Sequence, residues 1–396
     1  MMMLNTATQQ FIREHLRDDV RQLALQSHRY PSLDIDFLLA LTQISGRQQI
    51  EHKIPSWYSN DNLLYPKRLS LEQSSSETMA KYKSTLLSGN TLADLTGGLG
   101  VDTAFLAPNF STVYYVEQQT ALAAIAQSNF KSLNLNQIQV FGTDNKIFLE
   151  TMPAVDCIFI DPARRSDTGK KVCLIEDCEP DLLEIQDLLL QKAQRILVKL
   201  SPMLDIQAAC KVLKNISEIH VVGVENECKE LLFLIEKEII TNPKIVCVNL
   251  RKKGNQTDIF DFPEEKQAQI PFVSELKNYL YEPNVAILKA GMYKLLGLRY
   301  GLEKLHPDSH LYTSESLVSG FPGRAFQIEN VFSFQKQELK THLQSIRQAN
   351  VVVRNFPLSV AGLRKKLNLK EGGDIYLFAT TLTNERRVLV LGRKLF

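Results

Sequence analysis

The spacing of apolar side chains changes along this 396-residue chain. In residues 1–85 apolar positions such as Phe37, Leu41 and Ile44 recur at intervals of three and four, which predicts amphipathic helices. From residue 91 onward, short apolar runs alternate with helical stretches, which predicts strands separated by helices. The runs that we interpret as strands are 91–95, 112–116, 138–141, 157–160, 196–200, 219–223 and 231–235.

This alternation is typical of a parallel, doubly wound α/β sheet. The last two predicted strands are too close for a crossover helix, so we expect one antiparallel edge. Residues 245–250 and 258–262 flank the polar stretch 252–255 and predict a hairpin. Residues 270–320 contain one predicted strand (278–281) and one predicted helix (285–296).

Residues 321–396 predict a compact α+β module. Its expected strands are 324–328, 351–354, 374–380 and 387–391, and its expected helices are 335–347 and 359–367. Ahead of the large sheet, Ser74 followed by Glu77 predicts a helix start with a capping box. The same serine-rich stretch also admits a second interpretation as a substrate-gating element.

Composition excludes several classes of protein. Hydrophobic residues make up 44% and charged residues 23%, as in globular proteins with full cores. No run approaches 18 apolar residues, so we expect no membrane span, and the polar first residues lack a signal-peptide core, so we expect a cytoplasmic protein. The six cysteines form no C-x-x-C pair and no zinc-ligand spacing, so we expect reduced thiols and no metal.

Charge is distributed unevenly. Residues 1–240 hold 23 basic and 30 acidic side chains, whereas residues 241–396 hold 23 and 14, and the last 76 residues alone carry a net charge of +8. A basic C-terminal part suggests a polyanionic partner, although a merely solvated basic face explains the same counts.

The strongest chemical signal is a glycine-rich loop between a strand and a helix. Asp94 ends the strand, Thr96, Gly98 and Gly100 follow in the loop, and Asp102 opens the helix. Residues without a Cβ let the backbone approach a ligand, and a helix start offers free N–H groups. A dinucleotide fingerprint lacks its third glycine here, and the spacing instead fits the first motif of class I methyltransferases. Any tight strand–helix turn that needs glycine is the alternative explanation.

Two further acids follow the next two strands. Glu117 ends the second strand, where a carboxylate accepts hydrogen bonds from ribose hydroxyls, and Asp144 follows the third, where a carboxylate receives an adenine amino group. Each alone is an ordinary strand-end acid. Together with the glycine-rich loop they predict a nucleoside site at the crevice of an open sheet.

The fourth strand ends in Asp161-Pro162-Ala163-Arg164. Methyltransferases that act on nitrogen place Asn or Asp and Pro here, and the acid and the proline carbonyl accept hydrogen bonds from the nucleophilic nitrogen. Asp161 and Pro162 preserve both acceptors, and the guanidinium of Arg164 is suited to stacking on a base or gripping a phosphate. A surface Asp-Pro turn is the structural alternative.

A cysteine nucleophile is the rival chemistry, because methylation at a pyrimidine carbon needs a thiolate. The positions where such enzymes carry cysteine read Asp161-Pro162 and Lys199-Leu200-Ser201-Pro202 in this chain. We therefore expect direct transfer without a covalent intermediate, with Arg164 or Lys199 contacting the target.

Nearly the full chain resembles bacterial class I S-adenosylmethionine-dependent methyltransferases that carry a C-terminal THUMP-like domain, many of them from Bacteroidetes. The matching stretches are residues 71–82, 94–102, 161–165, 199–202, 279–291, 353–358 and 367–381. The resemblance implies S-adenosylmethionine as cofactor and four parts: a helical N-terminal region (1–85), a Rossmann-like methyltransferase domain (86–268), a ferredoxin-like segment (269–320) and a THUMP-like domain (321–396).

True THUMP domains help present RNA to modifying enzymes, so the resemblance and the basic C-terminus suggest a structured RNA as partner. The basic residues that we expect at phosphates are Arg354, Arg364, Lys365, Lys366 and Lys370. The sequence thus predicts a methyltransferase acting on a nitrogen of an RNA base. A protein or small-molecule acceptor and a catalytically degenerate RNA-binding protein are the alternatives.

Overall fold

A computed structural model describes residues 4–30, 34–66, 68–164 and 175–396, with the side chains of residues 68, 69 and 164 outside the description. The chain divides into two compact units. The first holds Met1–Ser217 and Leu232–Ile240, and the second holds Glu218–Leu231 and Thr241–Phe396.

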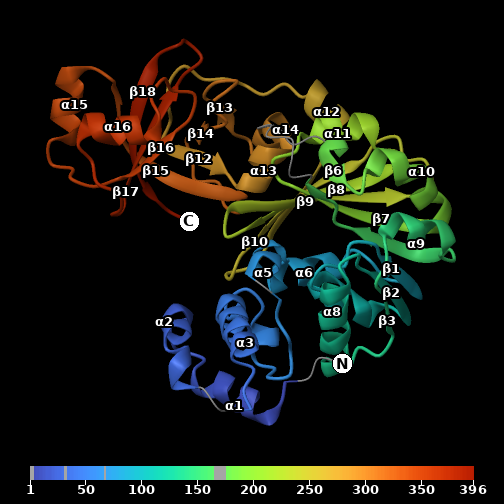
Figure 1. Cartoon of the computed structure of the whole chain (residues 1–396). Coiled ribbons are helices and arrows are strands. Elements are labelled where there is room, and N and C mark those ends of the chain that lie inside the picture. Colours follow the sequence, from blue (N-terminus) through green and yellow to red (C-terminus); the bar gives the residue numbers. More distant parts are fainter. Residues whose placement is uncertain (1–3, 31–33, 67, 165–174) are drawn as a thin grey trace. The chain divides into compact units, whose positions relative to one another are not determined.

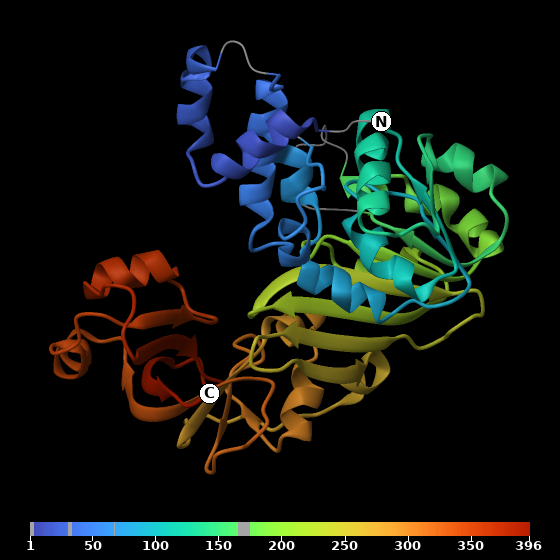
Figure 2. The same ribbon diagram turned by 90° about the horizontal axis from the view of Figure 1, so that it is seen from below.

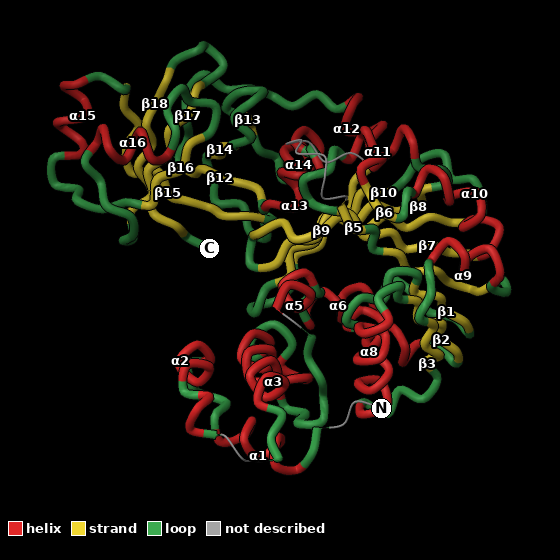
Figure 3. Tube along the Cα trace, in the orientation of Figure 1, coloured by secondary structure: helices red, strands yellow, loops and turns green. Residues whose placement is uncertain are grey.

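The first unit begins with helices, as the apolar spacing predicts. Figure 3 shows this region as helices and connections. Its helices are α1 (Thr6–Glu14), α2 (Val20–Leu25), η1 (Ser27–Arg29), α3 (Phe37–Ile50), α4 (Pro55–Tyr58), α5 (Arg68–Gln73) and α6 (Glu77–Ser84). Phe11, Leu23 and Ile44 lie in the shared core of the first three α-helices.

The helix start at residue 77 differs from the predicted one. The N-cap of α6 is Ser76, whose side chain accepts the Met79 N–H, so the predicted capping box at Ser74 is wrong. Ser74 instead donates its hydroxyl to the Leu71 carbonyl and so satisfies the end of the preceding helix. In a run of three serines each hydroxyl can bond a different group, and the spacing alone does not say which serine caps the helix.

A parallel sheet follows, built from the predicted apolar runs. Its parallel strands are β1 (Thr91–Asp94), β2 (Thr112–Val116), β3 (Ile138–Phe141), β4 (Val155–Ile160) and β7 (Ala193–Leu200), in the order β3-β2-β1-β4-β7. The chain first builds outward from β1 to β3 and then returns to the other side of β1. This reversal leaves a crevice at the carboxyl ends of β1 and β4, where open α/β sheets bind ligands.

Helices cover both faces of this sheet, and Figure 1 shows α8 on one face and α9 and α10 on the other. The helices are α7 (Val101–Leu106), η2 (Ala107–Asn109), α8 (Thr120–Ser132), α9 (Asn145–Thr151), α10 (Leu182–Lys192) and α11 (Ile206–Val212). After β4 lies a small antiparallel pair, β5 (Ala163–Arg164) and β6 (Cys178–Glu179), with the turn η3 (Ile175–Asp177) before β6.

The strands β8 (Ile216–Val224) and β9 (Glu227–Glu236) are neighbours inside the sheet, because β9 lies next to β7 and a further strand lies on the other side of β8. The antiparallel edge predicted from these two strands is therefore misplaced. Their two-residue turn, Glu225 and Asn226, has positive φ angles of 47° and 65°, as a tight hairpin requires. β10 (Lys244–Leu250) runs parallel to β8, and β11 (Gln256–Asp261) runs antiparallel to β10. The predicted hairpin at 252–255 is therefore confirmed.

The rest of the second unit is a separate sheet with the order β13-β14-β12-β15-β18-β17-β16. Its elements are α12 (Phe262–Gln267), β12 (Tyr279–Pro283), α13 (Val285–Ala290), α14 (Tyr293–Arg299), β13 (Glu303–Lys304), β14 (Tyr312–Ser314), β15 (Gly323–Ser333), α15 (Lys336–Leu343), β16 (Asn350–Val353), α16 (Val360–Leu367), β17 (Ile375–Thr381) and β18 (Arg387–Lys394). Helices α15 and α16 pack beside β15–β18 (Figure 2) and share a core that contains Leu343, Leu363 and Leu377.

The single helix predicted at 285–296 is wrong, because the chain forms two helices there. Gly291 ends α13 in the left-handed conformation with φ of +78°, and α14 starts two residues later. The apolar spacing continues across this break, which is why periodicity alone joined the two helices. Within the described residues, no helix is long and apolar enough to cross a membrane.

Candidate active site

The loop after β1 is built around a buried carboxylate. Asp94 is 1% exposed and accepts hydrogen bonds from the Thr96 N–H (3.0 Å) and the Thr103 hydroxyl. A Cβ on Gly97 would lie 2.1 Å from the Tyr115 ring, and one on Gly100, where φ is +80°, would lie 2.5 Å from the Phe130 ring. These positions therefore require glycine for packing and for backbone conformation.

The carboxylate of Glu117 ties the same loop to the end of β2. It accepts the Gly98 N–H (2.9 Å) and the Gln119 N–H (2.7 Å) and is 8% exposed. Gly98 has φ of +57°, and the closest atom to a Cβ there would be the Thr96 carbonyl oxygen at 3.8 Å. At Gly98 the loop therefore exposes backbone without a side chain, next to the fixed carboxylate of Glu117.

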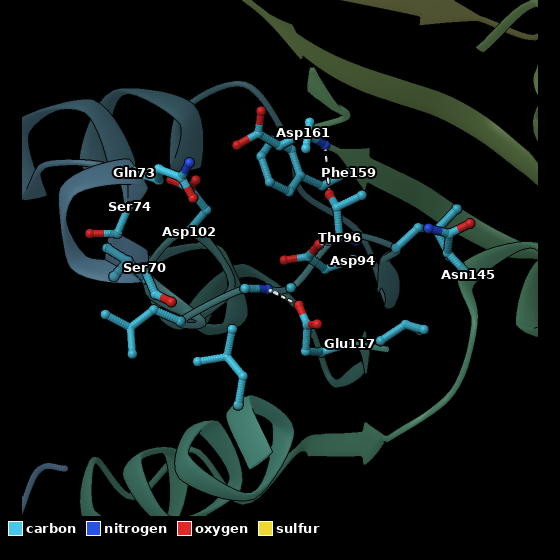
Figure 4. A pocket seen from close by; sticks show the side chains of 18 of the residues that line it. Ser70, Gln73, Ser74, Asp94, Thr96, Asp102, Glu117, Asn145, Phe159 and Asp161 are labelled. Atoms are coloured by element: carbon cyan, nitrogen blue, oxygen red, sulfur yellow. Dashed lines mark hydrogen bonds between the residues drawn. The ribbon is translucent and has the colours of Figure 1, made fainter. Parts of the chain in front are cut away.

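A cavity of about 440 Å³ opens at this point, within the usual range for small-molecule sites. Figure 4 shows Asp94, Thr96, Glu117 and Asp161 around it. The sequence-predicted residues among its described lining are Asp94, Thr96, Gly98, Asp102, Glu117 and Asp161. The crevice predicted from the strand ends is therefore where these side chains meet.

Asp161 is held at both its backbone and its side chain. Its N–H donates to the Thr96 hydroxyl oxygen (2.6 Å), and its carboxylate pairs with the Lys199 ammonium. The Asp161 side chain is 32% exposed and Lys199 is 15% exposed, and both line the cavity. Lys199 thus contacts Asp161, a partner that the sequence did not predict; the prediction that Arg164 or Lys199 contacts the target stays a prediction.

The rest of the Asp-Pro motif lies beside Asp161. Pro162 is buried, and Ala163 pairs with Glu179 across the β5–β6 ladder, where both residues line the cavity. The backbone of Arg164 is in β5, but its side chain lies outside the described part of the chain.

Gly100 and Asp144 are not among the described lining residues. Gly100 ends the loop as the N-cap of α7. Asp144 is exposed and caps α9, where its Oδ1 accepts the N–H groups of Lys146 and Ile147. The next residue, Asn145, lines the cavity and was missed by the sequence analysis, because a strand-end acid is the more familiar signal.

The cavity is rich in negative charge. Its described ionisable lining residues are Asp94, Asp102, Glu117, Asp161, Glu179 and Lys199. Burial raises the pKa of Asp94 to about 7, and hydrogen bonds from Thr103 and Thr96 offset this only in part. A lining of this kind favours a cationic ligand.

One solved structure covers the whole chain. A protein of Porphyromonas gingivalis W83, provisionally named as a methyltransferase, is 35% identical, covers 100% of both chains and superposes with a TM-score of 0.90. The chain belongs to this methyltransferase family.

Other relatives agree with this assignment. Two proteins of Mycobacterium tuberculosis, from strains CDC 1551 and H37Rv, are named uncharacterized S-adenosylmethionine-dependent methyltransferases. Each is 20% identical over 316 residues, which cover 79% of this chain and 83% of the relative. Residues 279–322 match a ferredoxin-like domain family, and residues 323–394 match a THUMP-like domain family. The chain is an S-adenosylmethionine-dependent methyltransferase with a C-terminal THUMP-like domain.

The cavity of this methyltransferase fits its cofactor. S-adenosylmethionine carries a sulfonium cation, an ammonium group and two ribose hydroxyls, and the lining supplies carboxylates that suit all of them. Glu117 at the end of β2 is suited to the ribose hydroxyls, and bare backbone at Gly98 leaves room for close approach.

The cysteines of the methyltransferase are not placed as nucleophiles. None of the described ones lines the cavity, and Cys173 lies outside the described residues. Burial raises the pKa of the Cys157 and Cys210 thiols to about 11, and it also raises the pKa of the Cys228 and Cys247 thiols. These four are therefore protonated thiols at neutral pH.

The five basic residues predicted for RNA fall into two groups. Arg354 donates to the buried carboxylate of Glu282 (2.8 Å), and Arg364 pairs with Glu371 (2.9 Å). Lys365, Lys366 and Lys370 are exposed on or just after α16, and the Lys366 ammonium lies 4.6 Å from the centre of the Phe334 ring. The three lysines are the ones that present charge to solvent.

Proposed function

We propose that this methyltransferase methylates a nitrogen of a base in a structured RNA, by direct transfer without a covalent enzyme intermediate. The observation that carries the proposal is Asp161, fixed at the edge of the cavity by Thr96 and Lys199. A carboxylate held there with a neighbouring proline carbonyl is suited to an acceptor that donates N–H bonds.

The Lys199 contact limits how Asp161 can act. Lys199 pairs with Oδ2, so on this proposal Oδ1 of Asp161 accepts from the target nitrogen together with the Pro162 carbonyl. Two such acceptors would orient an N–H-bearing nitrogen with its lone pair toward the methyl group.

Methyl transfer needs little further catalysis from the protein, because the methyl donor is already activated. S-adenosylmethionine supplies an activated methyl group whose leaving group is a neutral thioether. As the new N–C bond forms, the nitrogen loses one proton, which Asp161 is positioned to accept and pass to water. No described cysteine lines the cavity, which is consistent with a route without a covalent intermediate.

Two observations support RNA as the acceptor. The THUMP-like match covers 323–394, and within it Lys365, Lys366 and Lys370 are exposed. Lysines of this kind contact phosphates and position a nucleic acid without reading its sequence. Their binding therefore falls with rising salt.

The test is transfer of labelled methyl from S-adenosylmethionine into RNA, protein and metabolite fractions from cells that lack this protein. We expect label in the RNA fraction with the wild type and none with Asp161→Ala. Label confined to protein or metabolites would assign the acceptor to one of those classes and would leave the basic surface a docking role only. A folded Asp161→Ala variant with full turnover would remove Asp161 from the mechanism.

A further inference from the structure

Two stretches that carry the family resemblance, residues 279–291 and 353–358, have no part in the mechanism above. The structure joins them at one buried carboxylate. Glu282 lies in β12 and is 2% exposed, and its Oε1 accepts a hydrogen bond from Nη2 of Arg354 at 2.8 Å. Its Oε2 accepts from Nε of Arg324 at 2.9 Å and also from Nη2 of that residue. One carboxylate therefore holds two guanidinium groups.

Strand pairing fixes the first of these arginines. Glu282 and Arg324 are register partners on the antiparallel strands β12 and β15, which lie side by side in the second sheet (Figure 1), so their side chains share one face. The guanidinium carbon of Arg324 is 5.6 Å from the ring centres of both Phe326 and Tyr376. A guanidinium that rests on two rings and pairs with a carboxylate has a defined orientation.

Arg354 reaches the same carboxylate from the far end of the sheet. It follows β16, and its backbone N–H donates to the Ala379 carbonyl at 2.9 Å, which ties it to β17. Its Nε–H is buried and has no acceptor among the described residues. A guanidinium placed only for its ion pair is expected to have its buried donors bonded, so the contact with Glu282 does not account for the whole group.

The two arginines, which we call the arginine pair, carry more charge than their partner neutralises. In the described part of the chain, Glu282 is the one carboxylate in ion-pair contact with either of them. Their side chains are 29% and 37% exposed, so solvent reaches both. Burial and the positive charges of Lys304 and Arg354 lower the pKa of His310 to about 4, so this neighbour is neutral. The arginine pair is therefore a fixed, net positive and partly open group.

We propose that Arg324 and Arg354, oriented by Glu282, bind one phosphate group, and that an RNA strand supplies it. The RNA source rests on the proposed function, and the net charge of +8 on the last 76 residues agrees with it. Planar N–H forks match the spacing of phosphate oxygens, and Glu282 uses Nε and Nη2 of Arg324, which leaves Nη1 for the ligand. Glu282 is thus a positioning residue. A phosphate held here has a defined place, whereas one that meets an exposed lysine does not.

The first test titrates the wild-type protein with cytidine monophosphate and follows the arginine Nε–H signals by NMR, assigned through their backbone amides. Cytidine is used because an adenine nucleotide is able to compete for the cofactor cavity. We expect the signals of Arg324 and Arg354 to shift. Arg393 is the internal control, because it pairs with Glu329 (2.6 Å) on the same sheet but is 64% exposed. Its signal should not shift at the same concentrations.

The second test compares RNA binding by lysine variants. Arg324→Lys and Arg354→Lys keep the charge but lose the planar fork. Each should weaken binding of an RNA oligonucleotide by about tenfold, the size of one lost hydrogen bond to a charged group. The slope of log affinity against log salt should stay unchanged, because the number of neutralised phosphates is the same. Arg393→Lys makes the same substitution in an exposed ion pair and should bind as the wild type does.

Two results would overturn the proposal. Unshifted Arg324 and Arg354 signals in the wild type would remove the phosphate site. Shifted signals together with wild-type RNA affinity in both lysine variants would remove RNA as the source and leave a free nucleotide as the ligand. The titration contains no RNA and no methyl acceptor. Failure of the proposed RNA methylation therefore leaves the NMR shifts in place, whereas failure of the phosphate site abolishes them.

Discussion

The cofactor cavity holds mostly acidic side chains that are fixed in place, whereas the surface formed by Lys365, Lys366 and Lys370, here called the α16 surface, presents exposed basic ones. In the cavity the carboxylates of Asp94, Glu117 and Asp161 are each fixed by backbone N–H groups, hydroxyls or an ion pair. On the α16 surface Lys365 and Lys370 are exposed to solvent. Fixed charges suit chemistry that needs defined geometry, whereas exposed lysines suit a partner recognised by its phosphates.

The largest effect should come from Asp161. Asp161→Ala is expected to lower turnover by about 10² to 10⁴-fold, because a single general base contributes an effect of this size. S-adenosylmethionine binding should be retained. The measurement is single-turnover methyl transfer to RNA. Asp187→Ala is the control, since Asp187 also pairs with a lysine (Lys214, 2.7 Å) but on an exposed surface. A similar loss in both variants would contradict the role of Asp161.

The next effect concerns the rigidity of the cavity. Gly100→Ala places a Cβ against the Phe130 ring at a φ of +80°, so we expect a loss of roughly 3 kcal/mol in the free energy of unfolding from backbone strain and overpacking together. Gly254→Ala shares a positive φ but meets no atom within 4 Å, so it should lose only about 1 kcal/mol. Denaturant titration of the two variants would show whether the loop is as tightly packed as these contacts indicate.

Substitutions on the α16 surface should change RNA binding and leave cofactor binding unchanged. Replacing Lys365, Lys366 and Lys370 together by Ala should lower RNA affinity and reduce the slope of log affinity against log salt by about 2 to 3 units, roughly one for each lost phosphate contact. S-adenosylmethionine affinity should not change. An unaltered salt slope would mean that RNA binds elsewhere.

The smallest effect is a pH dependence of cofactor binding. Burial raises the pKa of Asp94 to about 7, with Asp102 and Asp161 adding repulsion. A sulfonium cation favours ionised Asp94, so binding releases a proton and affinity should rise several-fold from pH 6 to pH 8, then level off. S-adenosylhomocysteine lacks this cation, so its affinity should change less. Equal pH profiles for the two would place the sulfonium away from Asp94.

The sequence predicted the parts of the first unit that depend on local pattern. Apolar runs identified β1 to β4, and the glycine-rich loop and strand-end acids identified part of the cavity lining, namely Asp94, Thr96, Gly98, Asp102, Glu117 and Asp161. Such signals lie within a few residues of one another. The capping box at Ser74 and the single helix across Gly291 failed because the same local patterns admit two hydrogen-bonding solutions.

The parts that could not be predicted depend on contacts between distant residues. The sequence analysis assigned no partner to Lys83 in α6, and only the fold brings it to Asp102. Likewise Arg354 appeared free for RNA until the fold placed Glu282 beside it. Periodicity says which side of a helix is apolar, but it does not say which charged side chains meet across elements.

The most direct test of the central claim is mass spectrometry of nucleosides from cellular RNA. RNA from cells with the wild-type protein, from cells without it and from cells with Asp161→Ala would be compared. We predict one nucleoside methylated at a base nitrogen, present in the wild type and absent from the other two. A nucleoside methylated at carbon or at a ribose oxygen, or three identical RNA profiles, would contradict this account.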